Sequence, residues 1–130
     1  MFTIPMSTLS LAAILDLIGV NEFCWSILHI WAVSNQQSDI NVLSLEEKTK
    51  SSTGYQLRWD ALVEIVKNLD EVYECTIVAV DSPNQLPDRN LPSEELKKLC
   101  DIVIEGVDST VWEITVRNDE LNQKLSKHFS

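Results

Sequence analysis

Three segments of the chain carry apolar residues at the three-to-four-residue spacing that is typical of amphipathic helices. In residues 7–19 the pattern begins at Ser7, which can cap the first turn, and ends at Gly19, which can adopt the left-handed conformation that follows many helices. Residues 59–69 show the same spacing most clearly. Residues 119–129 place acids in the first turn and bases near the end, in keeping with the helix dipole. We therefore predict three helices.

Other segments have the composition of strands. Residues 23–34 are apolar at odd and even positions alike, which predicts a central strand buried on both faces, although a buried helix has the same pattern. Residues 73–80 are rich in Ile, Val and Thr and predict a second strand. Residues 101–116 predict a hairpin that turns at Asp108 and Ser109. The hairpin residues expected to face the core are Ile102, Ile104, Trp112, Ile114 and Val116.

The remaining segments are polar or rich in proline. Residues 35–54 predict a loop with one helical turn at 45–48, and residues 82–92 predict a second loop before a short turn at 93–99. The whole chain, residues 1–130, has the length of a single domain. The order α-β-α-β-β-β-α predicts an α+β fold with a sheet of about four strands and helices packed mainly on one face. The helical connection permits a parallel pair and the hairpin is antiparallel, so we expect a mixed sheet.

The net charge of the chain comes from one stretch. Residues 60–120 hold 15 of the 20 Asp and Glu but only 5 of the 10 Lys and Arg, and their balance equals the net charge of −10 of the whole chain. A concentrated negative field attracts a basic protein and repels nucleic acid and anionic lipid. The apolar run at 9–20 is too short to span a bilayer, is interrupted by Asp16 and lacks a preceding base. We expect a cytoplasmic protein that binds neither nucleic acid nor a membrane.

The chain contains no catalytic or cofactor motif that we can identify. His29 and His128 have no Cys or His at metal-ligand spacing, and His29 lies among apolar residues, which predicts a buried core histidine. Cys24, Cys75 and Cys100 predict buried free thiols in a reducing compartment. Glycine-rich phosphate loops and nucleophile-elbow sequences are missing. We expect no enzyme, no metal and no cofactor, and keep an enzyme that uses carboxylates without a motif as an alternative.

The acids of the predicted hairpin form the candidate binding surface. Such a surface suits a partner rich in Lys and Arg, and charge complementarity accelerates its association. The alternative is a solvated face whose charge serves solubility alone. Four tryptophans are expected in the core, although tryptophan is also a favoured interface anchor, so one of them can lie at the surface. The candidate partner-binding residues are Asp101, Glu105, Asp108 and Glu113, joined by Asp81 and Asp88 from neighbouring loops.

Residues 54–62 (GYQLRWDAL), 100–105 (CDIVIE) and 108–114 (DSTVWEI), the last running into the terminal helix, together resemble small bacterial immunity proteins of contact-dependent growth inhibition and related polymorphic toxin systems. The resemblance covers about the C-terminal three-fifths of the chain. It implies a cytoplasmic, acidic protein that binds and neutralises a cognate toxin domain, frequently a basic nuclease. The shared motifs are structural, so no binding residue is carried across. The alternative is a small acidic adaptor or a self-associating module, including a homodimer, without catalytic activity.

Overall fold

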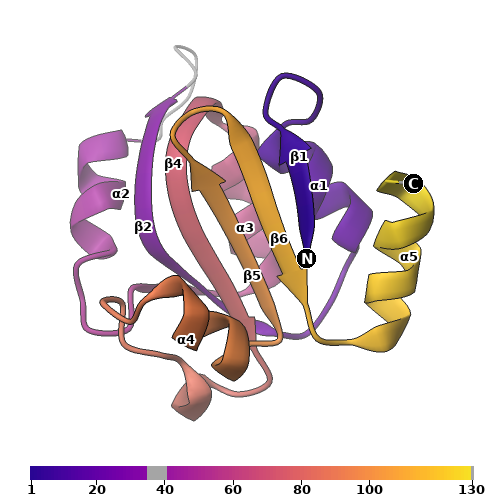
Figure 1. The fold of residues 1–130 in the computed structure, drawn as a ribbon. Coiled ribbons are helices and arrows are strands. Elements are labelled where there is room, and N and C mark those ends of the chain that lie inside the picture. The colour runs from indigo at the N-terminus through magenta and orange to yellow at the C-terminus, as the bar shows by residue number, and fades with distance from the viewer. Residues whose placement is uncertain (35–40, 130) are drawn as a thin grey trace.

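A six-stranded sheet forms the centre of the molecule (Figure 1). The computed structural model describes residues 1–34 and 41–129. The spatial order of the strands is β1-β6-β5-β4-β2-β3, and every neighbouring pair is antiparallel. In chain order the strands are β1 (Phe2–Pro5), β2 (Cys24–Ser34), β3 (Tyr55–Leu57), β4 (Leu69–Val80), β5 (Ile102–Val107) and β6 (Val111–Val116).

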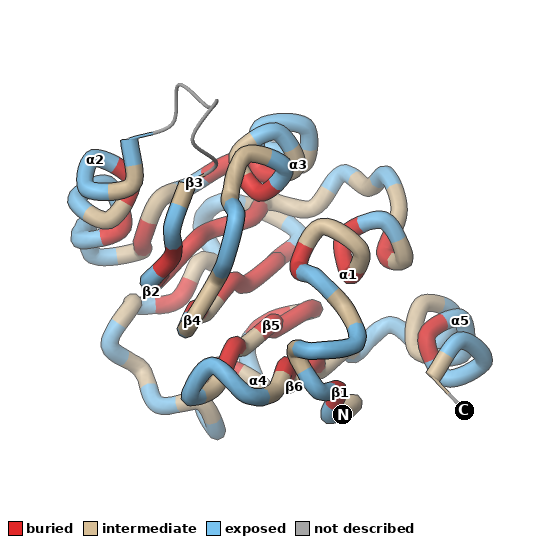
Figure 2. The backbone as a smooth tube through the Cα atoms, turned by 90° about the horizontal axis from the view of Figure 1, so that it is seen from above, coloured by how far each residue is buried: buried red, intermediate tan, exposed pale blue. Residues whose placement is uncertain are grey.

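The helices cover the two faces of this sheet unequally (Figure 2). Helices α1, α3 and α5 pack on one face, which we call the inner face, and α4 packs on part of the opposite, outer face. Helix α2 lies beside β2 at one margin. The helices are α1 (Leu11–Ile18), α2 (Val42–Lys48), α3 (Trp59–Lys67), α4 (Ser93–Leu99) and α5 (Asp119–Phe129), with a short 3-10 turn at Pro83–Gln85.

The main core lies between the sheet and the three inner helices. Trp25 and Ile77 from the central strands are fully buried, and Leu62 of α3 and Leu125 of α5 are fully buried against the same face. Burial of side chains of this size stabilises the fold by about 1.5–3 kcal/mol each. The expectation that five apolar hairpin residues face one side is confirmed for this core, where four of them are buried and Val116 packs at the margin.

The outer face is covered at one end only. There Leu96 of α4 and Cys100 pack on Leu28, Val78 and Val103 in a second, smaller core. The sequence of β4 reflects this division, because its first six residues are exposed or half-buried whereas all but one of its last six are buried. The other end of the outer face carries no helix in the described part of the chain (Figure 1).

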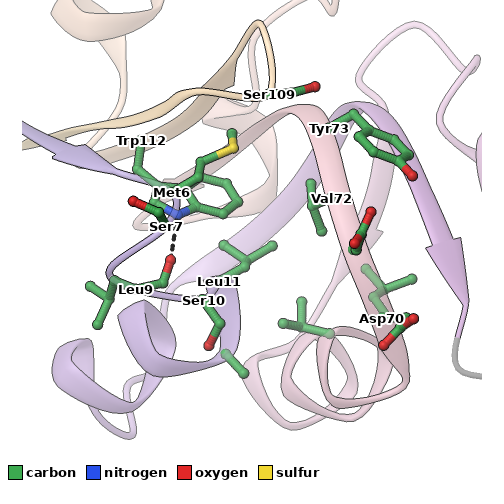
Figure 3. Close-up of a pocket in the computed structure, with 14 residues that line it drawn as sticks. Met6, Ser7, Leu9, Ser10, Leu11, Asp70, Val72, Tyr73, Ser109 and Trp112 are labelled. Atoms are coloured by element: carbon green, nitrogen blue, oxygen red, sulfur yellow. Dashed lines mark hydrogen bonds between the residues drawn. The ribbon is translucent and has the colours of Figure 1, made fainter.

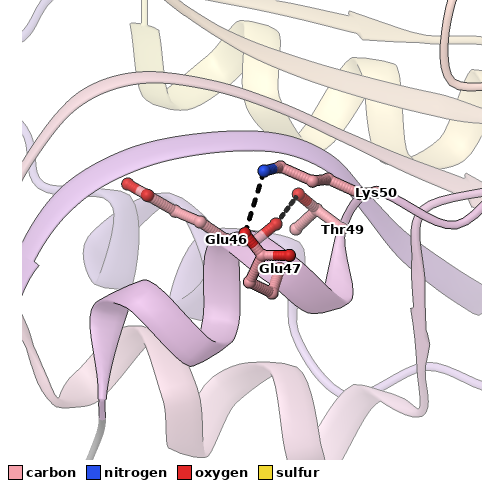
Figure 4. Close-up of polar contacts among 4 residues, drawn as sticks. All are labelled: Glu46, Glu47, Thr49 and Lys50. Atoms are coloured by element: carbon pink, nitrogen blue, oxygen red, sulfur yellow. Dashed lines mark hydrogen bonds and ion pairs between the residues drawn. The ribbon is translucent and has the colours of Figure 1, made fainter.

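Helix α2 protects the margin of β2 that β3 does not reach. β3 pairs only with Trp25–Ile27, and α2 contacts β2 beyond that point. At the end of α2 the buried Thr49 donates its hydroxyl hydrogen to the carbonyl oxygen of Glu46 over 2.6 Å, and Lys50 forms an ion pair with Glu47 at 2.9 Å (Figure 4). A covered edge cannot pair with a second chain, so α2 closes this side of the sheet.

The α+β class is confirmed, and the predicted strand number and order are wrong. β1 and β3 contain only four and three residues, too few to produce a recognisable alternation. The expected mixed sheet is also wrong, because β3 reverses the chain before α3 begins. The helical connection through α3 joins β3 and β4, which run parallel to each other. Because β2 lies between them, every pair of hydrogen-bonded neighbouring strands is antiparallel.

Several predicted segments begin or end elsewhere. The first helix begins after Ser10, whose side chain accepts a hydrogen bond from the Ala13 amide, and not after Ser7. The helical turn expected at 45–48 is part of α2, and the loop expected at 35–54 contains that helix. Residues 35–40 of that loop lie outside the described residues. The hairpin and the terminal helix are confirmed.

Candidate functional site

The uncovered end of the outer face brings side chains from five strands together. One row across the sheet pairs His29 with Thr76, Thr76 with Glu105, Glu105 with Glu113, and Glu113 with Thr3. Trp31 pairs with Glu74 and Val107 with Val111 closer to the hairpin turn. We call this surface the open outer face. It consists of Thr3, His29, Trp31, Glu74, Thr76, Glu105, Val107, Val111 and Glu113.

Trp31 is the largest apolar group exposed on the open outer face. Its side chain is 57% exposed, whereas Trp25 on the same strand is fully buried. The Trp31 ring lies 5.0 Å from the ring of Tyr73, and the planes are tilted by 48°. This contact restricts the rotamers of an exposed indole before any partner arrives. Rigid aromatic side chains of this kind are enriched among the residues that dominate protein interfaces.

Glu105 and Glu113 face each other directly on adjacent strands. Like charges in this position repel, so the pair costs stability unless a cation lies between the carboxylates. One oxygen of Glu105 accepts a hydrogen bond from the Ser93 hydroxyl over 2.9 Å. None of the three ion pairs found within the described residues includes Glu74, Glu105 or Glu113. The geometry therefore favours a Lys or Arg side chain supplied from outside.

The margin of the open outer face next to α2 is held by an Arg–His contact. Nη2 of Arg89 donates to Nδ1 of His29 over 2.8 Å, and Nε2 of His29 donates to the Arg89 carbonyl oxygen over 2.8 Å. His29 is exposed, so its predicted burial is wrong. The β-bulge between Ile27 and His29 places His29 on the outer face. A hollow of about 330 Å³ is lined by this contact together with Trp31, Glu46, Lys50 and Glu74.

The six acids predicted from the sequence do not lie together. Glu105 and Glu113 are neighbours on the open outer face, but Asp101 and Asp108 lie beyond opposite ends of β5. Six residues of strand separate them, a span of roughly 20 Å. Asp81 follows the end of β4, at the same end of the sheet as Asp101, whose amide donates to Ala79. Asp88 lies in the loop before α4, where its carboxylate accepts from the Asn90 amide.

Sequence reasoning missed Trp31, Tyr73 and Glu74 as surface residues. Trp31 lies in an apolar run whose pattern predicts burial on both faces of the sheet. The position of α4, which covers one end of the outer face, leaves the end with Trp31 open. The signal that was present is on the partner strand, where acids at Glu71 and Glu74 precede a segment that is apolar apart from Thr76. A strand whose first half is acidic and whose second half is apolar indicates a sheet with one exposed end.

A second hollow lies at the start of β4, and we call it the edge pocket. It has a volume of about 410 Å³ and is lined by apolar side chains that include Leu9, Leu11 and Trp112, with Asp70 and Glu71 as its charged residues. Figure 3 shows these groups converging from the β1–α1 loop, β4 and β6, with the indole nitrogen of Trp112 donating to the Leu9 carbonyl over 2.7 Å.

Tyr73 connects the edge pocket to the open outer face. It lines the pocket and also contacts Trp31. A hydrogen bond to Glu71 and the charge of that carboxylate raise the pKa of the Tyr73 hydroxyl above 10.0, and Asp70 adds to the effect. The phenol is therefore uncharged at neutral pH, and its hydrogen is donated to the Glu71 carboxylate.

The cysteines are free, and two of them are inert by burial. Loss of water contact raises the pKa of the Cys75 thiol to about 12 and that of Cys100 to about 11. Thiols with such values carry almost no thiolate at neutral pH and react slowly. The prediction of buried free thiols is confirmed for Cys75 and Cys100, whereas Cys24 is half-buried.

The described residues contain neither a cluster that could bind a metal ion nor a helix that could span a membrane. Within residues 1–34 and 41–129, no three His, Cys, Asp or Glu side chains are grouped so that they could hold a metal ion. Among the same residues, no helix combines the length and the apolar character needed to cross a bilayer. No protein-family model, no curated protein and no solved structure matches the chain.

Proposed function

We propose that this chain is an immunity protein, a cytoplasmic inhibitor without catalytic activity that binds a basic toxin domain through its open outer face. The observation that carries the proposal is the exposed Trp31, which packs on Tyr73 and is bordered by glutamates that take part in none of the three ion pairs found within the described residues. The resemblance of three sequence segments to immunity proteins supports the same function.

The parts of this surface have different roles in binding. Trp31 supplies the apolar centre, where loss of water contact produces most of the affinity. Glu74, Glu105 and Glu113 select a cationic partner and accelerate the encounter, because a negative field attracts a basic protein from a distance. A toxin that acts on nucleic acid exposes Lys and Arg side chains around its active site. An inhibitor that covers those side chains prevents the nucleic acid from binding.

Self-association through the same surface is the weaker proposal. It would bring two copies of Glu74, Glu105 and Glu113 together, and repulsion between equal patches opposes such a dimer at low ionic strength. The exposed Trp31, together with the exposed Val33 next to this surface on β2, is the observation in its favour.

The test is binding and neutralisation of the toxin domain encoded beside this gene. We expect a tight complex and rescue of cells that express the toxin. Trp31→Ala should weaken the complex by about 2 kcal/mol, roughly thirtyfold, because it removes the anchor. Val20→Ala is the matched control, since Val20 is 93% exposed but lies outside the open outer face.

Two results would contradict the proposal. If no adjacent toxin domain exists or binds, the chain is not an immunity protein of this type. If Trp31→Ala binds as tightly as the unchanged protein, the complex forms through another surface.

A further inference from the structure

One side of β4 has an open hydrogen-bonding edge. β2 pairs with β4 along almost its whole length, from Leu69 to Val80, whereas β5 pairs only with Cys75–Ala79. Before Cys75, the one backbone hydrogen bond found from the hairpin side within the described residues runs from the Ser109 amide to the Tyr73 carbonyl, at 3.0 Å. The preceding residues therefore offer backbone groups to an added strand.

The edge pocket lies directly against this open edge. Leu69, Val72 and Tyr73 form one wall of the pocket, and Leu9 and Trp112 belong to the opposite side. Its volume of about 410 Å³ lies within the range of sites that bind ligands of moderate size. An extended segment placed along β4 would thus have a cavity for one of its side chains.

The charges at the pocket determine which side chains can flank that position. Asp70 and Glu71 are the charged lining residues, and both are exposed. Neither takes part in an ion pair within the described residues, and the nearest base in sequence, Lys67, pairs with Glu64 at 4.0 Å. A segment with Lys or Arg close to its apolar residue therefore complements this site.

We propose that the open edge of β4 and the edge pocket bind an extended basic segment of the partner protein. Its main chain adds a strand beside Leu69–Tyr73, one aliphatic side chain enters the pocket, and its bases lie against Asp70 and Glu71. In strand addition the main-chain hydrogen bonds provide affinity and the pocket provides sequence preference. This inference depends on the proposed function only for the identity of the partner.

The test uses the free protein and synthetic probes. We would titrate the ¹⁵N-labelled chain with a capped six-residue peptide that alternates leucine and lysine, and follow the amide resonances. Two matched peptides replace every lysine with glutamate or every leucine with serine. We expect shifts at Leu69–Tyr73 and at Ser109 with the lysine–leucine peptide, and at least tenfold weaker binding of both controls.

Variants of the protein test the same contacts. Asp70→Lys with Glu71→Lys should weaken peptide binding roughly tenfold, because attraction becomes repulsion at two positions. Asp81→Lys with Asp119→Lys changes the net charge equally at the opposite end of the sheet and should bind normally. Ser7→Trp fills the mouth of the pocket without a change of charge and should also weaken binding.

Several results would overturn the inference. These are equal binding of the glutamate or serine peptide, shifts confined to the open outer face, or unchanged binding by the Asp70 and Glu71 variant. Concentration-dependent shifts at the edge without peptide would instead assign it to a second copy of this chain. If the toxin complex forms but the lysine–leucine peptide does not bind, the inference fails and the proposed function stands. If the peptide binds at this edge but no toxin complex forms, the proposed function fails and the peptide site stands.

Discussion

Trp25 and Trp31 lie on the same strand and have opposite environments. Trp25 is fully buried, packs against Trp59 at 5.4 Å between ring centroids and donates its indole hydrogen to Asn21 over 2.8 Å. Trp31 is mostly exposed, and its ring packs on that of Tyr73. The residue type is the same, and the covering helices determine whether each indole stabilises the fold or remains available to a partner.

Burial of Cys75 predicts how stability depends on alkaline pH. The pKa of this thiol is raised from 9.0 to about 12, so the folded protein keeps it neutral where the unfolded chain ionises. The stabilisation is complete below pH 9 and is lost as pH rises from 9 towards 12. We expect a fall of about 1.4 kcal/mol per pH unit from this group, measured by urea unfolding between pH 9 and 10.5.

Two substitutions separate this ionisation from packing. Cys75→Ala and Cys75→Ser change stability at pH 7 by different amounts, but neither side chain ionises, so both should show a smaller fall above pH 9 than the unchanged protein. Equal slopes in all three proteins would show that the Cys75 thiol is not held neutral by burial.

Single residues also mark the limit of sequence reasoning about the site. The pairing of Glu105 with Glu113 follows from the hairpin register and was predictable. Asp101 was grouped with them because alternation places it on the same face, but distance along the strand and the position of α4 separate it from the open end. The periodicity of a strand shows on which face of the sheet a side chain lies. Whether a helix covers that face depends on residues that are distant in sequence.

At the scale of elements, the long segments were predictable and the short ones were not. β2, α3 and the hairpin each contain enough residues to show a period. β1 has four residues and is fixed by pairing with β6, a strand more than 100 positions later. β3 is likewise fixed by β2 and not by its own pattern. Tertiary pairing supplies the information that these short edge strands lack.

The turn before β3 depends on Gly54 and gives a prediction at this scale. Gly54 has φ of +78°, and an added Cβ would lie 2.6 Å from the Ile27 carbonyl oxygen and 2.8 Å from a methyl group of Leu28. Gly54→Ala therefore combines left-handed strain with a steric clash against β2. We expect a loss of about 3 kcal/mol in the free energy of unfolding, measured by urea denaturation.

Gly19→Ala is the matched control. Gly19 has φ of +81°, but an added Cβ would meet only the flexible Lys124 side chain, at 3.4 Å. Gly19→Ala should therefore lower the free energy of unfolding by the backbone strain alone, about 1–2 kcal/mol. Equal losses at Gly19 and Gly54 would show that close approach to β2 is unimportant.

At the scale of the molecule, incomplete coverage and charge determine where a partner can dock. Three helices bury the inner face and α4 buries one end of the outer face (Figure 1). The remaining end exposes Trp31 among acids. The net charge of −10 produces a long-range field, but the field alone does not specify a surface. The exposed tryptophan and the facing glutamates Glu105 and Glu113 localise the contact that we propose.

The most direct test of this account compares charge reversal at two ends of the molecule. The association rate of the proposed toxin partner would be measured by stopped flow for Glu74→Lys with Glu113→Lys and for Asp81→Lys with Asp119→Lys, which change the net charge equally. We predict that the first pair slows association roughly tenfold or more at low ionic strength, with a smaller effect at about 0.15 M salt, while the second pair changes it little. Equal slowing by both pairs would contradict the account, because the toxin would then respond to net charge and not to the open outer face.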